Sequence, residues 1–137
     1  MKYALLLLFF ALLSGCQTTS PEPGITGQGE FTASDPEYGY VPHKPVKLGG
    51  FLRGSKYEGS HIEYFQSLTG PNGEPVKVKR LGSCCPFEDK TMPFGGGMLD
   101  KYELRYRGQK KPVTIYVNLY QFEAPQAPQA PQGFTLL

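Results

Sequence analysis

The stretch MLDKYELRYRGQKKPVTIYVNLYQF, residues 98–122, decides the fold. Apolar side chains alternate with charged ones in its first half, and with polar or tyrosine side chains in its second half. A period of two is typical of a β-strand that buries one face. Turn-forming residues 108–111 separate the two halves. We therefore predict a long β-hairpin with one aliphatic face and one polar, tyrosine-bearing face.

Two segments before this hairpin predict further strands. Residues 76–81 alternate apolar and basic side chains, and the turn sequence Pro-Asn-Gly-Glu at 71–74 leads into them. Residues 46–52 form a weaker candidate, because Gly49 and Gly50 interrupt it. Residues 95–97 are all glycine and predict a flexible connection. The expected result is a small antiparallel sheet of three to four strands.

Residues 56–68 predict the one helix of the chain. Their apolar side chains recur every third residue, at Ile62, Phe65 and Leu68. Ser60 and Glu63 have the spacing of a capping box, and Gly70-Pro71 ends the pattern. A helix of about two to three turns must be held by packing, so it is expected to cover the apolar side of the sheet. The predicted fold class is α+β.

The composition divides the chain into four parts. Strong β-formers concentrate in residues 46–122, which predicts one small domain there. Residues 16–45 are rich in Pro, Gly, Ser and Thr, as in a flexible stalk, although Tyr38 and Tyr40 could fold back onto the domain. Residues 123–137 contain Ala-Pro-Gln three times. This repeat favours polyproline II and predicts either a semi-rigid tail or a peptide ligand for another envelope protein.

Residues 1–15 have the layout of a secretory signal peptide: a basic start, an apolar segment and small residues before Cys16. The sequence Leu13-Ser14-Gly15-Cys16 resembles the lipidation signal of bacterial lipoproteins. That resemblance implies that Cys16 receives a diacylglyceryl group and becomes the new N-terminus. Attachment through two or more acyl chains is stable, whereas one chain binds only marginally.

The residue after Cys16 indicates the location, and the charge of the mature chain indicates the partners. In Gram-negative lipoproteins an Asp after the cysteine favours retention in the inner membrane, and this chain has Gln17 there. We therefore expect attachment to the outer membrane, facing the periplasm. Removing residues 1–15 leaves 13 Lys and Arg against 12 Asp and Glu, since only Lys2 is lost from the 14 basic residues. This balance argues against nucleic acid and leaves the membrane and another envelope protein as expected partners.

Cys84 and Cys85 are adjacent, and thiols rarely persist in an oxidising compartment without a role. Neighbouring Cα atoms lie about 3.8 Å apart, whereas disulfides prefer about 4.4–6.8 Å, so a bridge between them would be strained. It would also close almost no chain loop, and strained bridges are easily reduced. Two interpretations stay open: a rigid turn or buried thiol pair, and a redox role.

Soft-metal handling is a further possibility for the cysteine pair. Side chains that would suit copper(I) are available elsewhere in the chain, at His43, His61, Met92 and Met98. None of them has a recognised ligand spacing, and a Cys–His nucleophilic site would need a histidine brought to the thiol by folding. The sequence therefore assigns no catalytic residue, no metal ligand and no cofactor, and it predicts no enzymatic activity.

The segment 82–122 combines Gly-Ser-Cys-Cys-Pro-Phe, a glycine-rich loop, Leu-Asp-x-Tyr and Lys-Pro-Val-Thr-Ile-Tyr-Val-Asn-Leu-Tyr. With these motifs it resembles a family of small bacterial lipoproteins of unassigned activity. Some members carry the automated name 2-dehydro-3-deoxyphosphooctonate aldolase, but such aldolases resemble (β/α)8 barrels of about 250 residues. The resemblance implies a lipoprotein. We expect a membrane-anchored binding or structural module of the cell envelope, with thiol redox or soft-metal chemistry at Cys84 and Cys85 as the alternative.

Overall fold

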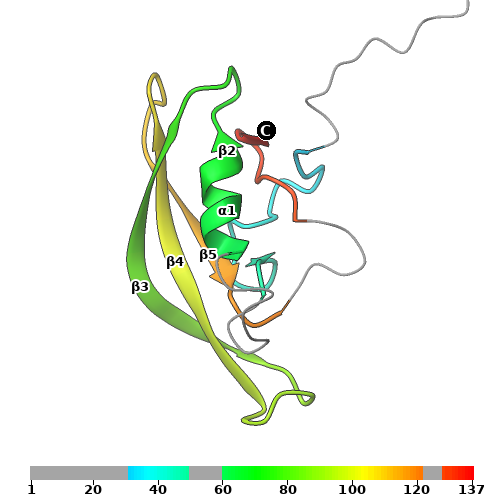
Figure 1. Ribbon diagram of the computed structural model, residues 1–137. Helices are drawn as coiled ribbons and strands as arrows, with labels where there is room; N and C mark the ends of the chain where they lie inside the picture. Colours follow the sequence, from blue (N-terminus) through cyan, green and yellow to red (C-terminus); the bar gives the residue numbers. More distant parts are fainter. Residues whose placement is uncertain (1–30, 50–59, 122–127) are drawn as a thin grey trace, which may run out of the picture.

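The computed structural model describes residues 31–49, 60–121 and 128–137 (Figure 1). Its elements in chain order are β1 (Val46–Lys47), α1 (Ser60–Ser67), β2 (Leu68–Thr69), β3 (Val76–Glu88), β4 (Gly96–Tyr106), β5 (Val113–Asn118) and β6 (Thr135–Leu136). A four-stranded sheet has the order β1-β5-β4-β3, and β2 pairs with β6 in a second, two-stranded sheet. The predicted α+β class, with a small sheet and one helix, is confirmed.

The central hairpin forms as its alternation predicts. β4 pairs antiparallel with β5, with Tyr102 opposite Ile115, and β3 pairs antiparallel with the other edge of β4. β1 differs from the expectation, because it is only two residues long and joins β5 in parallel, with Val46 beside Val117. No tight turn connects β1 to β5 in the chain, so nothing imposes the antiparallel direction of a hairpin.

The core lies between the aliphatic face of the sheet and α1. Leu104, Ile115 and Val117 are each 0% exposed, and the Phe65 ring centroid lies 4.6 Å from that of Tyr102. The expected apolar helix face is wrong at one position, since Ile62 is 51% exposed. Tyr64, two residues further along α1, is buried in the core instead, beside the predicted Leu68, which is the first residue of β2.

The folded unit is wider than the predicted domain of residues 46–122. Ala33, Ala130 and Phe134 are buried, and the Ala33 amide donates to the Ala130 carbonyl at 2.8 Å. Tyr38 and Tyr40 pack against the core, as expected for side chains that fold back. The boundaries that assigned 31–45 to a stalk and 128–137 to a tail are therefore corrected.

The short helix explains why segments outside residues 46–122 are part of the core. α1 has only eight residues, about 12 Å of helix, while β3 and β4 are much longer, so the helix leaves part of the sheet face uncovered. Segments 31–48 and 128–136 cover it beside α1 (Figure 1). The predicted signal peptide, Cys16, residues 16–30 of the stalk and residues 123–127 of the tail lie outside the described residues.

β3 and β4 extend further than the alternation indicated. β3 continues from the predicted strand through the cysteine pair to Glu88, and β4 begins at Gly96, inside the predicted flexible connection. A Cβ at Gly96 would lie 2.0 Å from the Phe87 carbonyl oxygen. Glycine is needed there because the two backbones approach too closely for any side chain.

Candidate functional site

The cysteine pair lies at an irregularity in β3. The register with β4 shifts between Arg80 and Gly82 and again between Cys84 and Pro86, so Leu81 and Cys85 are the extra residues of two β-bulges. Cys85 has φ +43°, the left-handed region that non-glycine residues rarely adopt. Residues in this conformation must be held by the surrounding structure, and they occur most often at functional sites.

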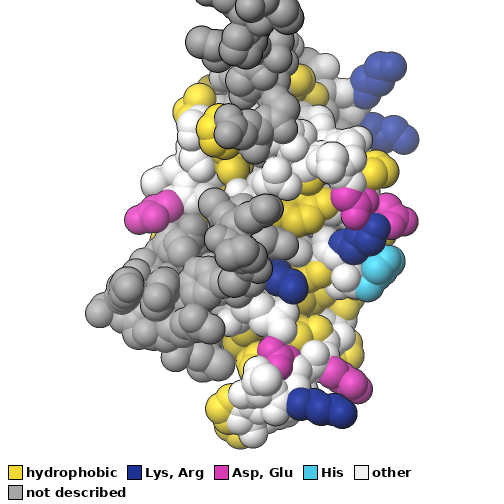
Figure 2. Space-filling model, turned by 90° about the vertical axis from the view of Figure 1, so that its right-hand side faces the viewer, with side chains coloured by type: hydrophobic (Ala, Val, Ile, Leu, Met, Phe, Trp, Pro, Cys, Tyr) yellow, Lys and Arg dark blue, Asp and Glu magenta, His cyan; other side chains and the backbone are white. Residues whose placement is uncertain are grey.

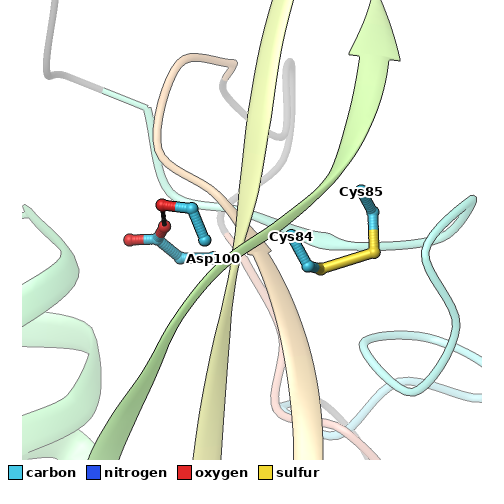
Figure 3. Close-up of a disulfide and its surroundings, with 4 residues drawn as sticks. Cys84, Cys85 and Asp100 are labelled. Atoms are coloured by element: carbon cyan, nitrogen blue, oxygen red, sulfur yellow. Dashed lines mark hydrogen bonds between the residues drawn. A yellow bond between two sulfur atoms is a disulfide. The ribbon is translucent and has the colours of Figure 1, made fainter.

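The two cysteines are joined by a disulfide, with their Cα atoms 3.8 Å apart (Figure 3). On a regular strand, neighbouring side chains point to opposite faces, which would keep these sulfur atoms apart. The bulge changes this, because Cys84 stays paired with Leu99 while Cys85 has no partner in β4. Both side chains are half-buried, so the disulfide lies near the surface of the protein.

A polar network lies beside the disulfide. The Arg80 guanidinium donates two hydrogen bonds of 2.9 Å to the Asp100 carboxylate, and the Ser83 hydroxyl donates a third of 2.8 Å. The Asp100 side chain is only 10% exposed. The Arg80 bonds, helped by the Ser83 bond, lower the pKa of Asp100 against the opposing effect of burial. The buried carboxylate therefore stays ionised and paired at neutral pH.

This network and the disulfide flank β3 from opposite sides. Figure 3 shows the Asp100 carboxylate on one side of the strand and the sulfur atoms on the other. Ser83 is opposite Asp100 and Cys84 is opposite Leu99 in the register, so the network fixes the residue that directly precedes the bridge. The site is therefore a disulfide at a β-bulge of β3. A charged hydrogen-bond network holds the strand in place next to the disulfide.

Sequence reasoning missed Arg80, Ser83 and Asp100. Arg80 and Asp100 are 20 residues apart, and no spacing rule connects them. Gly82, with φ +120°, was the available signal, since a glycine inside a strand pattern often marks a bulge. Such a bulge realigns the side chains that follow it.

Of the other candidate ligands, only Met98 is next to the cysteines in the register, opposite Pro86. His43 lies on the surface, His61 is in α1, Met92 is in the loop between β3 and β4, and Met98 is 45% exposed on β4. In the described ranges, no group of three or more His, Cys, Asp and Glu side chains could hold a metal ion. Both thiols are engaged in the bridge, so neither is a free nucleophile in this state.

Comparisons with protein-family models, with curated proteins and with solved structures found no match. None of the helices in the described part of the chain has the length and apolar character to cross a bilayer.

Proposed function

We propose that the protein is a lipid-anchored protein of the outer membrane, and that its folded domain is a periplasmic binding or structural module of the envelope. The observation that carries this proposal is the sequence Leu13-Ser14-Gly15-Cys16 directly after a short apolar segment. Residues 17–30 separate the lipidated cysteine from the described domain. At about 3.3–3.6 Å per residue, these 14 residues could span at most about 50 Å.

The surface of the domain supports a binding module. The polar side chains of the Arg80–Asp100 network satisfy one another, and no buried side-chain nitrogen or oxygen in the described residues lacks a hydrogen-bond partner. A groove between α1 and β3 is lined mainly by apolar side chains. Such a surface is suited to contact with a partner.

Replacing Cys16 by serine tests the anchor. We expect Cys16→Ser protein to leave the membrane fraction, because the thiol that carries the lipid is missing. The measurement is the distribution of the protein between the membrane pellet and the soluble envelope extract. A Cys84→Ser, Cys85→Ser double variant is the matched control and should stay in the pellet. If Cys16→Ser protein remains in the pellet as fully as the control, the proposal is wrong.

Thiol redox chemistry at Cys84 and Cys85 is the second candidate function, favoured by the observed bridge on a bulge. The bridge joins adjacent residues, so it adds almost nothing to stability through loop closure. Reduction would also remove the covalent link to Cys84, which constrains Cys85 while its backbone has a positive φ. A dithiol reductant would supply two electrons and two protons, leave two thiols here and become a disulfide itself.

The redox candidate predicts a bridge that is easier to reduce than a structural disulfide. We expect its midpoint potential to lie above about −300 mV, the value below which structural disulfides of secreted proteins typically lie. Protein from envelopes is equilibrated in dithiol buffers of known potential, the free thiols are alkylated, and the peptide spanning residues 82–88 is weighed. A bridge that remains closed well below that potential would assign the pair to structure alone.

A further inference from the structure

β3 is an open edge of the four-stranded sheet. In the order β1-β5-β4-β3 it has a neighbouring strand on one side only, and no residue from 76 to 81 is buried. An edge strand presents unpaired N–H and C=O groups to its surroundings. β2 borders this edge only where β3 begins, through the bridge between Thr69 and Pro75. Within the described residues, the backbone edge from 76 up to the first bulge is therefore available for pairing.

An apolar groove lies between α1 and this part of β3. Its volume is about 550 Å³, and none of its lining residues is charged. Val76 and Val78 line it from β3. Ile62 and Phe65 line it from α1. Ile62 is 51% exposed, so part of this apolar wall is in contact with water, and an extended segment beside β3 would cover it.

The opposite face of the same edge is basic. Lys77 and Lys79 alternate with the two valines along β3, so they point away from the groove. On β4, Arg105 is opposite Lys77, and Glu103 is opposite Lys79. Like charges in directly opposite positions are unfavourable, so a carboxylate next to Lys77 would be stabilising. Neither lysine takes part in an ion pair within the described residues.

Further positive charge lies at the same end of the molecule. β3 begins at the top of Figure 1, and Figure 2 shows Lys or Arg side chains projecting at the upper right of that end. Lys77 also borders a hollow of about 510 Å³ together with Arg105 and Arg107. A negatively charged partner is therefore attracted to the end of the sheet at which β3 begins.

We propose that residues 76–80 of β3 bind an extended segment of a partner protein as an added strand, in which apolar residues alternate with acidic ones. Side chains of a strand point alternately to the two faces of a sheet. One set would enter the groove beside the two valines, and the other would lie beside the two lysines. In this mode of recognition, main-chain hydrogen bonds supply affinity and alternate side chains supply specificity. The partner gives the proposed binding module its ligand, so this step rests on that proposed function, although it does not require the anchor at Cys16.

A second copy of this chain is a poorer partner for the edge. In an antiparallel pair of two β3 strands centred on Val78, Lys77 of one copy would lie opposite Lys79 of the other, which is unfavourable. Lysines on an edge strand typically prevent such self-association. The same lysines favour an acidic strand. The bulges at Leu81 and Cys85 end the regular edge and limit the contact to residues 76–80.

The test is a calorimetric titration of the full chain carrying Cys16→Ser, which has no acyl chain that could occupy the groove. The probe is the end-blocked peptide Glu-Val-Glu-Val-Glu-Val-Glu, whose alternation is the same in both directions. Glu-Glu-Val-Val-Val-Glu-Glu has the same composition without the alternation, and Lys-Val-Lys-Val-Lys-Val-Lys reverses the charge. We expect the alternating acidic peptide to bind most tightly.

Amide hydrogen exchange shows whether the peptide pairs with β3. In the complex, the amides of residues 76–80 that face away from β4 should exchange more slowly, because the added strand accepts hydrogen bonds from them. N-methylation of alternate peptide amides gives a second readout. Methyl groups on the set that faces β3 should abolish binding, whereas methyl groups on the other set should be tolerated.

Variants separate the lysines from the groove. An opposite-charge pair across two strands contributes up to about a fivefold gain in affinity, so Lys77→Gln, Lys79→Gln protein should bind the acidic peptide about tenfold more weakly. Lys110→Gln, Lys111→Gln, between β4 and β5, removes the same charge and is the matched control, with an expected loss below about twofold. Lys77→Glu, Lys79→Glu protein should prefer the basic peptide. Ile62→Gln should weaken binding, because its side chain lines the groove.

Three results would overturn the proposal. If the alternating acidic peptide bound no more tightly than the peptide without alternation, strand pairing would play no part. Unchanged affinity in the Lys77→Gln, Lys79→Gln variant would show that the lysines do not select the partner. A dimer that slows exchange of the same amides without any peptide would assign the edge to a second copy. None of these results bears on membrane attachment, which fractionation of Cys16→Ser protein tests separately.

Discussion

Phe134→Ala is expected to lower the free energy of unfolding by about 3–5 kcal/mol, the usual effect of truncating a buried phenylalanine. Phe134 is 3% exposed, and its ring centroid lies 5.5 Å from that of Tyr106 in an edge-on arrangement. Domains of about this size are stable by about 5–15 kcal/mol, so the change removes a large share of the total. Urea denaturation followed by circular dichroism measures it.

Leu137→Ala is the matched control, three residues further along the same segment. Its side chain is 86% exposed, and its backbone amide donates to the Ser67 carbonyl at 2.9 Å, a hydrogen bond that does not involve the side chain. We expect a change within about 0.5 kcal/mol. If the two variants were equally stable, residues 128–137 would be a tail and not part of the core. Deleting residues 128–137 should unfold the domain, since Ala130, Pro131 and Phe134 are all lost from it.

Gly96→Ala is expected to destabilise the protein by about 3 kcal/mol, from overpacking together with a strained backbone. The added Cβ would meet the Phe87 carbonyl oxygen at 2.0 Å, and Gly96 has φ +150°, where side chains are strained. The obstacle is backbone, so the end of the β3–β4 hairpin must open to accept the methyl group. The urea midpoint measures the loss, and the NMR signals of Phe87 and Tyr120, whose rings lie 5.7 Å apart, should move.

Gly95→Ala separates the steric clash from the backbone preference. Gly95 has φ +72°, so alanine is strained there too, but no atom lies within 4 Å of its Cβ position. A loss of about 1–2 kcal/mol is therefore expected from the conformation alone. A Gly96→Ala variant no less stable than Gly95→Ala would contradict the close approach of the two strands.

Local sequence patterns predicted the central hairpin but not the segments that complete the core. Alternation predicted the hairpin because Leu104, Ile115 and Val117 must all lie on one face. No pattern could show that Ala130 and Phe134 cover the same core, because their burial depends on the area that α1 leaves open. Nor does the sequence distinguish Gly95 from Gly96, although only Gly96 faces another backbone.

The candidate site was predictable in part. The adjacency of Cys84 and Cys85 is visible in the sequence, but the rule of alternating side chains separates them, and only the bulge at Cys85 brings the sulfur atoms together. In the sequence, Asp100 is one polar residue of a predicted strand, but in the fold it is buried and hydrogen-bonded to Arg80. Long-range pairing of this kind follows from the register of β3 on β4.

The measurement that tests the central proposal most directly is the mass of the N-terminal peptide of the protein taken from cell envelopes. If the protein is a lipid-anchored envelope module, the chain begins at Cys16, and its first peptide carries the added mass of a diacylglyceryl group. A chain that still contains residues 1–15, or an unmodified thiol at Cys16, would contradict the account.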